Sequence, residues 1–145
     1  MHISDFSLYL ITDRLQTCGR ALEDVVRQAL DGGVRAIQLR EKSLSSAELY
    51  SIAVKMRRLT ADYGARLIIN DRIDIARAVA ADGVQIGVNS LPVAAARSIL
   101  MPGNVLIYSA HSIEEAVCAQ RDGVDFVTFG PVSYTHLTLP TIYSV

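Results

Sequence analysis

Short apolar segments alternate with amphipathic segments along the chain, and this pattern predicts alternating strands and helices. Six apolar runs are interpreted as strands, at residues 6–12, 34–39, 66–69, 84–86, 105–108 and 125–129. Between these runs, apolar residues recur three and four positions apart, as they do along one face of a helix. Strands that are separated by single helices run parallel, so we expect an α/β chain of about six strands and five helices around a parallel sheet.

Local signals mark where several of these helices begin. Residues 45–48 (Ser-Ser-Ala-Glu) and 112–115 (Ser-Ile-Glu-Glu) have the sequence of a capping box, in which side chains satisfy the first backbone N–H groups of a helix. Pro92 suits the first turn of another helix, because a proline loses no hydrogen bond there. The helix that follows residue 112 is expected to bury Ile113, Ala116 and Val117.

A recurring turn indicates a repeated strand-helix unit. The step Asp-Gly occurs at 31–32, 82–83 and 122–123, each time between a helix and the next strand. Two architectures are built from such units, an open doubly wound sheet and a (β/α)8 barrel. A chain of 145 residues is shorter than the ~200 or more of a complete barrel, so length alone favours the open sheet. In both folds ligands bind at the carboxyl ends of the strands.

Composition and charge exclude several classes of function. Half of the residues are apolar and 20% are charged, which is enough to bury a core. Fourteen Lys and Arg balance 15 Asp and Glu, so nucleic acid and anionic membrane surfaces are not expected partners. No apolar run reaches the ~20 residues that cross a bilayer, and the amino end lacks a signal-peptide pattern, which favours a cytoplasmic protein. Cys18 and Cys118 have no metal-ligand spacing and are expected to be free thiols.

Polar residues gather at the predicted strand ends. Gln38 and Arg40 alternate on one strand, so their side chains share a face, and their burial is costly unless they meet a polar partner. Arg40 and Lys42 together suit a phosphate or pyrophosphate. Asp71 follows Asn70 at the end of another strand, and a carboxylate beside bound phosphates is a usual ligand of Mg²⁺.

Purely structural interpretations of the same residues stay open. The basic strand end could be salt-bridged by Glu41 or Asp71, and Asn70 or Asp71 could cap a helix. His111 could cap the helix that begins near Ser112. Asp13 is interpreted as an ion-pair partner of Arg14 or of another cation at the strand ends.

The order of these motifs resembles the thiamine phosphate synthase/TenI family. The resemblance rests on LYLITDR (8–14), IQLREK (37–42), LIINDRIDIA (67–76), ADGVQIG with SLP (81–92), SAHSIEEA (109–116) and DFVTFGPV (125–132). It covers residues 1–132 as one partial domain and implies the family's (β/α)8 barrel, which overrules the open sheet. The chain is therefore expected to form an incomplete TIM barrel.

The resemblance also implies a reaction and a set of site residues. A synthase joins hydroxymethylpyrimidine pyrophosphate to a thiazole phosphate with Mg²⁺ and releases pyrophosphate. Carried over, Gln38, Arg40, Lys42 and Asn70 bind the pyrophosphate substrate, and Asp71 is the Mg²⁺ ligand. Ser109 contacts the pyrimidine or the leaving group, and is grouped with His111 as catalytic. The expected partners are these two phosphorylated small molecules; association with further copies of the chain is left open.

One departure from the family pattern favours an alternative activity. Synthases commonly carry a His and then Gln-Glu-Asp where this chain has Gln85 and then Val88-Asn89-Ser90, so the second acidic Mg²⁺ ligand is missing and the case for the metal is weaker. Members of the TenI type lack that motif too, and some tautomerise the thiazole phosphate without a metal. In that alternative His111 transfers the proton.

A second departure lies in residues 133–145. This tail contains no Asp, Glu, Lys or Arg and fits no helix pattern, so we expect a disordered or artefactual segment outside the family domain. On this interpretation the chain is a fragment that does not turn over. Two non-enzymatic alternatives remain, an open α/β sheet that only binds ligands, and a receiver-like domain with Asp71 as phosphoacceptor.

Overall fold

A computed structural model describes residues 7–130 and 141–144 of the chain. Six parallel strands pair with their sequence neighbours, and a seventh strand pairs antiparallel with the sixth. The strands are β1 (Tyr9–Ile11), β2 (Ala36–Leu39), β3 (Arg66–Asn70), β4 (Gly83–Ile86), β5 (Val105–Ala110), β6 (Phe126–Phe129) and β7 (Thr141–Ser144). The six predicted strands are confirmed, each within a few residues of its expected position.

One helix follows each of the first five strands on the outside of the sheet. These helices are α1 (Leu22–Asp31), α2 (Ser46–Asp62), α3 (Ile73–Ala78), α4 (Val93–Ile99) and α5 (Ile113–Asp122), and a short 3-10 helix, η2 (Arg14–Gln16), precedes α1. The predicted capping box of α2 is present, with Ser45 and Glu48 bonded reciprocally. Ser112 caps α5 by accepting a hydrogen bond from Glu115 N, and Pro92 is the N-cap of α4.

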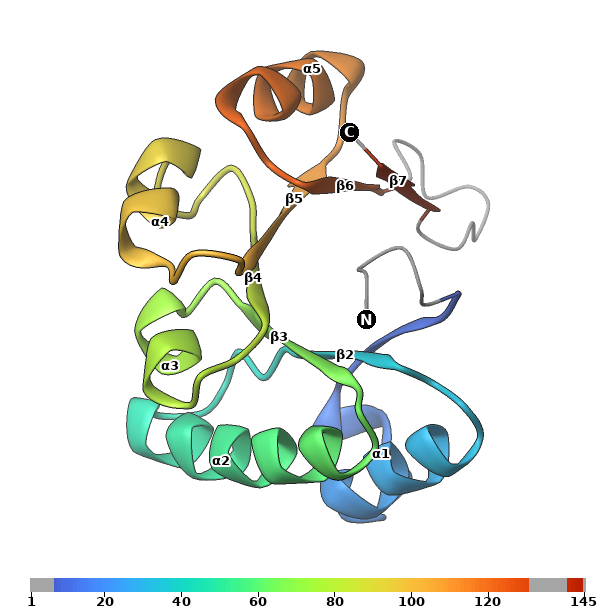
Figure 1. Cartoon of the computed structure of the whole chain (residues 1–145). Helices are drawn as coiled ribbons and strands as arrows, with labels where there is room; N and C mark the ends of the chain where they lie inside the picture. The colour runs from blue at the N-terminus through green and yellow to red at the C-terminus, as the bar shows by residue number, and fades with distance from the viewer. Residues whose placement is uncertain (1–6, 131–140, 145) are drawn as a thin grey trace.

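The order of the strands distinguishes the two predicted architectures. A doubly wound sheet reverses its strand order at a switch point, whereas here β1 to β6 follow one another around a curve with the helices outside it (Figure 1). This is the wall of a (β/α)8 barrel over six of its strands. The barrel expectation is confirmed, and the open sheet that length alone favoured is wrong.

Two hydrophobic clusters fill the molecule. The larger one lies between the strands and the helices and includes Leu30, Met56 and Leu67. A smaller one contains one buried residue from each of β3, β5 and β6, namely Ile68, Ile107 and Phe126. Because neighbouring strand residues point to opposite faces, this second cluster lines the inner, concave face of the sheet. The residues that lie beyond it along the strands therefore face the mouth of the barrel.

The prediction that α5 buries Ile113 and Val117 is wrong. Ile113 is 72% exposed and Val117 is 38% exposed, whereas Ala119 is 2% exposed. The helix packs on the sheet through Ala116 and Ala119, which lie one turn apart. Ile113 and Val117 lie on a neighbouring face of the same helix, so a short apolar repeat in the sequence did not identify the packed face.

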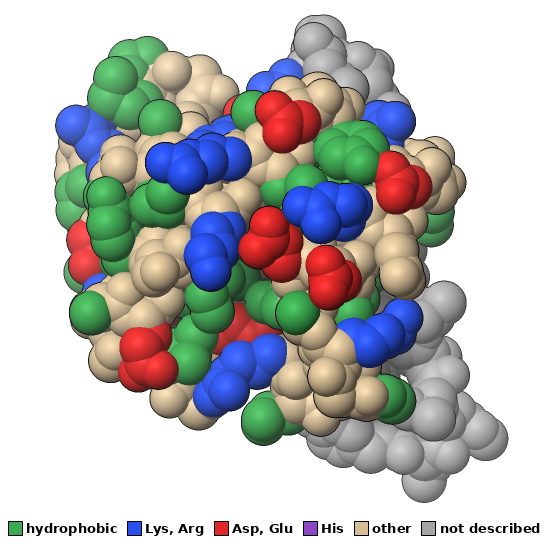
Figure 2. Space-filling model, turned by 90° about the horizontal axis from the view of Figure 1, so that it is seen from below, with side chains coloured by type: hydrophobic (Ala, Val, Ile, Leu, Met, Phe, Trp, Pro, Cys, Tyr) green, Lys and Arg blue, Asp and Glu red, His purple; other side chains and the backbone are tan. Residues whose placement is uncertain are grey.

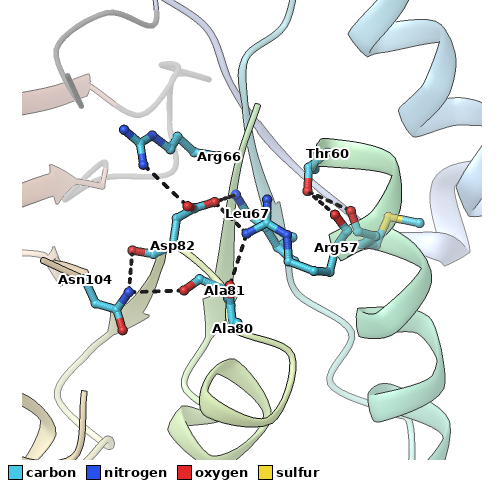
Figure 3. Close-up of polar contacts among 9 residues, drawn as sticks. Arg57, Thr60, Arg66, Leu67, Ala80, Ala81, Asp82 and Asn104 are labelled. Atoms are coloured by element: carbon cyan, nitrogen blue, oxygen red, sulfur yellow. Dashed lines mark hydrogen bonds and ion pairs between the residues drawn. The ribbon is translucent and has the colours of Figure 1, made fainter. Parts of the chain in front are cut away.

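Two aspartates close the amino ends of the strands in the same way. Asp82 precedes β4, accepts a hydrogen bond of 2.7 Å from Leu67 N of β3, and pairs with Arg57 of α2 at 2.9 Å (Figure 3). Asp125 precedes β6, accepts a bond of 2.8 Å from Leu106 N of β5, and pairs with Arg97 of α4 at 2.7 Å. Each carboxylate therefore joins a helix to the start of a strand.

The outer surface agrees with the balanced composition. On the face shown in Figure 2, Lys and Arg side chains are interspersed with Asp and Glu side chains. In the part of the chain that is described, no helix is long and apolar enough to cross a membrane. Cys18 and Cys118 are both exposed free thiols, as predicted. Most of the tail at 133–145 lies outside the described residues, which place only 141–144, in β7, so the expectation for the tail stays a prediction.

Candidate functional site at the carboxyl ends of the strands

A cavity of about 360 Å³ opens at the carboxyl ends of the strands. Six of the seven candidate site residues line it, and the seventh, Gln38, does not. The candidates that the fold brings together are Arg40, Lys42, Asn70, Asp71, Ser109 and His111. They come from the ends of β2, β3 and β5 and from the loops that follow, which are far apart in the sequence. The fold thus gathers these strand ends around one cavity, and the roles of the residues there stay predictions.

The loop after β2 directs two cations toward the cavity. Glu41 is buried and points away from it, where it accepts a hydrogen bond of 2.9 Å from Arg14 N and lies 4.0 Å from the Arg14 guanidinium. The backbone of Arg40 is held by Thr12, whose hydroxyl accepts from Arg40 N at 3.0 Å. Among the described residues, the side chains of Arg40 and Lys42 have no hydrogen-bond or ion-pair partner. The salt-bridged interpretation of this strand end is wrong.

Arg14 pairs with Glu41 and not with Asp13, the partner that the sequence predicted. Asp13 does not pair with it; its carboxylate caps η2 by accepting from Leu15 N at 3.0 Å and from the Gln16 side chain at 2.8 Å. The expected Asp13–Arg14 pair is therefore wrong. The cause is local, because an aspartate before a short helix finds backbone N–H groups closer than a neighbouring guanidinium.

Asn70 and Asp71 end β3 without serving as helix caps. The N-cap of α3 is Arg72, and no side chain caps that helix. Asp71 has a φ of 62°, in the left-handed region that Asp tolerates better than most residues, and its N–H donates to Gln85 O at 2.8 Å. The Arg72 guanidinium donates hydrogen bonds to the Asp74 carboxylate and is therefore not paired with Asp71. These bonds hold the pKa of the Asp74 carboxyl below its usual range. The Asp71 carboxylate, without a hydrogen bond or ion pair among the described residues, faces the cavity.

The turn after β4 forms another wall of the cavity. Ser90 Oγ accepts a hydrogen bond of 2.9 Å from Gly87 N, and Ser90 N donates to Gly87 O at 3.0 Å. Ser90 stands where the resemblance led us to expect an acidic residue in a synthase, and here its hydroxyl closes the turn. Asn89 also lines the cavity and offers an amide oxygen.

His111 lies at the rim on the β5 side. Its ring is 59% exposed, and its Nδ1 is 3.7 Å from Glu115 Oε2, which also accepts a bond of 2.8 Å from His111 N. Ser112 rather than His111 is the N-cap of α5. The ring lies over Gly130, where an added Cβ would approach the ring's Cδ2 to 3.4 Å. A larger residue at 130 would press on the ring.

Gln38 lies beneath the cavity in a buried polar row that sequence reasoning missed. Its amide nitrogen donates to Gln85 Oε1 at 2.6 Å and to the Tyr9 hydroxyl at 3.0 Å, and it is 1% exposed. Gln85 in turn donates to Ser109 and Thr128. The available signal was a polar residue inside an otherwise apolar strand, as at Gln85 in GVQI and Thr128 in FVTF. Whether Gln38 binds substrate stays a prediction.

The oxygen ligands at the cavity suit a metal ion that is also bound by the oxygens of a phosphorylated ligand. The described residues contain no group of three or more His, Cys, Asp or Glu side chains that could hold a metal by themselves. Asp71 supplies one carboxylate at the cavity, and Asn70 and Asn89 supply amide oxygens. Mg²⁺ is commonly held by one or two carboxylates together with phosphate oxygens, so the donor set fits Mg²⁺ only alongside a phosphate.

These features define a class: a parallel barrel-type α/β chain with a cavity lined by charged side chains at the carboxyl ends of its strands. Comparison with known families makes the class specific. The chain belongs to the thiamine monophosphate synthase family, whose model matches residues 8–138.

Individual relatives agree with this family. A protein of Geobacter sulfurreducens, provisionally named a thiamine-phosphate synthase, is 55% identical over 128 residues, which are 88% of this chain and 60% of the relative. The thiamine-phosphate synthase of Desulfitobacterium hafniense is 48% identical over 88% of this chain and 62% of its own length. The structure of a thiamine phosphate pyrophosphorylase from Pyrococcus furiosus matches with a TM-score of 0.79 and 40% identity, over 86% of this chain and 60% of the other.

The chain thus spans about three fifths of the length of the relatives that it matches. The names of these relatives do not favour the tautomerase, the open binding domain or the receiver-like domain. A receiver-like domain is also at odds with the sequential strand order.

Proposed function

We propose that this chain supplies the pyrimidine-pyrophosphate site of a thiamine-phosphate synthase. The observation that carries the proposal is the set of unpaired polar side chains around one cavity, two cationic and one anionic, from Arg40, Lys42 and Asp71, none of which has a side-chain partner among the described residues. Ligands bind at the carboxyl ends of the strands in this fold, and unpaired charged side chains there are available to a ligand. The family of the chain provides the ligand class, a hydroxymethylpyrimidine pyrophosphate that reacts with a thiazole phosphate.

The proposed chemistry needs charge stabilisation more than a nucleophile. In the coupling, the thiazole nitrogen supplies the electron pair of a new bond to the pyrimidine methylene carbon. The bond between that carbon and the pyrophosphate oxygen breaks, its electron pair goes to the oxygen, and negative charge grows on the leaving group. Arg40 can hold two phosphate oxygens as a fork, and Lys42 provides a compact positive charge. Because both are already directed to the cavity, they stabilise that growing charge without reorganising.

Asp71, with Asn70 and Asn89 beside it, is proposed to hold Mg²⁺ against the pyrophosphate oxygens. The bound ion would supply further positive charge to the leaving group. Asp71 is well suited to this because no hydrogen bond or ion pair among the described residues competes for its carboxylate. The family's second carboxylate is replaced by Ser90, so weaker retention of the metal is expected before the substrate binds.

Ser109 and His111 are proposed to contact the ligand from the β5 side. Ser109 reaches the cavity from the strand itself, and His111 stands at its rim beside Glu115. The two ring nitrogens of a histidine can donate or accept hydrogen bonds, which suits contact with a bound pyrimidine or phosphate.

Isothermal titration of the chain with hydroxymethylpyrimidine pyrophosphate tests the proposal. Saturable 1:1 binding that tightens when Mg²⁺ is added is the expected result. A parallel titration with the thiazole phosphate alone serves as the comparison. Binding of the thiazole phosphate but not of the pyrimidine pyrophosphate would contradict the proposal and revive the tautomerase.

A further inference from the structure

Five polar side chains form one hydrogen-bonded row across the concave face, directly beneath the cavity. They come from five different strands and are Tyr9 of β1, Gln38 of β2, Gln85 of β4, Ser109 of β5 and Thr128 of β6. Gln85 is 5% exposed and Thr128 is 7% exposed. Ser109 is the member of this row that also lines the cavity. The hydrogen bonds within the row can therefore orient the Ser109 hydroxyl, which is the part of the row that a ligand in the cavity would meet.

Gln85 is the centre of the row and uses its whole amide. Its Oε1 accepts from the Tyr9 hydroxyl at 2.9 Å and from Gln38 Nε2 at 2.6 Å. Burial raises the pKa of the Tyr9 phenol above its usual range, so this hydroxyl keeps its hydrogen and remains a donor. Two donors on the amide oxygen leave the amide nitrogen for the other side of the row. There it donates to Ser109 Oγ at 2.7 Å and to Thr128 Oγ1 at 2.9 Å.

This arrangement determines what the Ser109 hydroxyl can do. Its oxygen accepts from Gln85, and Thr128 Oγ1 approaches it at 3.5 Å. In both of these contacts the Ser109 oxygen is the acceptor, so its own hydrogen is used by neither. A hydroxyl has one hydrogen to give, and the side chain lines the cavity, so that hydrogen is available to a ligand there.

We propose that Gln85 is a positioning residue that holds the Ser109 hydroxyl as a hydrogen-bond donor toward a phosphate oxygen of the bound ligand. The inference rests on the proposed function, because it takes the ligand to be a pyrophosphate. Gln85 itself does not touch the ligand; it acts through Ser109. An unprotonated phosphate oxygen accepts hydrogen bonds and donates none. A serine that is oriented as a donor therefore favours such an oxygen, and a serine that is oriented as an acceptor would oppose it.

The test is a double-mutant cycle read by isothermal titration with inorganic pyrophosphate and Mg²⁺, using the whole chain. Gln85→Met keeps the side-chain length but removes the amide. We expect it to weaken pyrophosphate binding about tenfold, as loss of a hydrogen bond to a charged group does. In the Ser109→Ala background, where there is no hydroxyl to orient, the same change is expected to cost less than about twofold.

Thr128→Val is the matched control inside the same row. It removes a hydroxyl that Gln85 contacts, together with the long 3.5 Å contact of that hydroxyl with Ser109 Oγ, but it leaves the Gln85–Ser109 bond of 2.7 Å and does not alter the cavity lining. Its expected effect on pyrophosphate binding is less than about twofold, because the donor to Ser109 is kept. A control that lost as much affinity as Gln85→Met would show that any damage to the row weakens binding, and would overturn the assignment.

A second variant keeps the test decisive if Gln85→Met does not fold, which circular dichroism and thermal unfolding would reveal. In Gln85→Glu the carboxylate can accept hydrogen bonds but cannot donate one to Ser109. The added negative charge is present both with Ser109 and in the Ser109→Ala background, so its effect cancels in the comparison. The variant's loss of affinity is expected to be about tenfold larger in the chain that retains Ser109 than in the Ser109→Ala chain. Equal losses in the two backgrounds, or no loss in either, would overturn the positioning role.

The failure of the inference is distinguishable from failure of the proposed function. If the unmodified chain does not bind pyrophosphate with Mg²⁺, both are wrong. If the unmodified chain binds it and the cycle shows no coupling between Gln85 and Ser109, only the positioning role is wrong.

Discussion

Two aspartates at the amino ends of the strands, Asp82 and Asp125, are paired with arginines, whereas Arg40, Lys42 and Asp71 at the cavity are not paired among the described residues. At the amino ends, Asp82 accepts from a backbone N–H and pairs with Arg57 and Arg66 (Figure 3). At the carboxyl ends, the side chains of Arg40 and Asp71 have no ion-pair partner among the described residues, although both face one cavity. Paired groups lower the free energy of the folded chain, whereas unpaired groups are left for a ligand. The difference separates the end that stabilises the fold from the end that we propose to be functional.

The largest expected effect comes from a contact at the amino end of β4. A Cβ added to Gly83 would lie 2.3 Å from the Val105 carbonyl oxygen, so the neighbouring strands must separate to admit it. Gly83→Ala is expected to lower the free energy of unfolding by about 3 kcal/mol, as overpacking of a core does. Urea unfolding measures this effect.

Gly87→Ala is the control at the carboxyl end of the same strand. Its added Cβ would meet Ser109 Cβ at 3.8 Å, an ordinary contact, so the free energy of unfolding should hardly change. Equal destabilisation by the two substitutions would contradict the close approach of β4 and β5 at Gly83.

Next in size is the loss of the Asp82 carboxylate. Asp82→Asn removes the ion pairs with Arg57 and Arg66 at a side chain that is 21% exposed. The expected cost is about 2 kcal/mol of unfolding free energy, while pyrophosphate binding should be unchanged. The control is Asp24→Asn, whose pair with Arg27 is on the surface of α1 and should cost less than ~0.5 kcal/mol. Weaker pyrophosphate binding by Asp82→Asn would place the amino end in the functional site.

At the carboxyl ends the expected effect is on binding and not on stability. Arg40→Ala should weaken the binding of pyrophosphate with Mg²⁺ about tenfold, or ~1.4 kcal/mol, because a charge-assisted hydrogen bond is lost. The free energy of unfolding should stay the same, since the Arg40 side chain has no partner to lose among the described residues. Arg58→Ala, at an exposed position of α2, is the matched control for titration. Wild-type affinity in Arg40→Ala would remove Arg40 from the site.

The smallest effect concerns the metal. Asp71→Asn should abolish most of the gain in pyrophosphate affinity that Mg²⁺ provides, a gain that we expect to be about fivefold or ~1 kcal/mol. Titrations with and without Mg²⁺ give this gain for each variant. Asp62→Asn, exposed near the end of α2, should leave the gain intact. If Mg²⁺ improves binding equally in the unmodified chain and in Asp71→Asn, another group holds the metal.

Much of the fold, and the gathering of the candidate residues around one cavity, could be predicted from local patterns. Strands and helices followed from the periodicity of apolar residues, and the ends of β2 and β3 carried Arg40, Lys42, Asn70 and Asp71 directly after apolar runs. Because the strands are parallel, their carboxyl ends meet at one edge, so residues distant in sequence could be expected to lie together. The family motifs then decided between the barrel and the open sheet.

What could not be predicted depends on partners that only the folded chain brings together. Arg14 pairs with Glu41 rather than Asp13, across a separation of 27 residues. Gln38 points into a row completed by Gln85 from another strand, and a polar residue inside an apolar strand does not show which side chain will be its partner. The exposure of Ile113 depends on which face of α5 meets the sheet. In each case several side chains could have formed the contact, and the packing of the folded chain determines which of them does.

Pyrophosphate is proposed to bind at the carboxyl ends of the strands and not elsewhere, and every functional role proposed above depends on this location. The most direct test is a titration of the isotopically labelled chain with inorganic pyrophosphate and Mg²⁺, followed by two-dimensional NMR of the backbone amides. We expect saturable shifts at residues 40–42, 70–71 and 109–111, with the amides of Asp82 and Asp125 unchanged. Shifts centred on Asp82 and Asp125, or no saturable shift at the carboxyl ends, would contradict the proposed location.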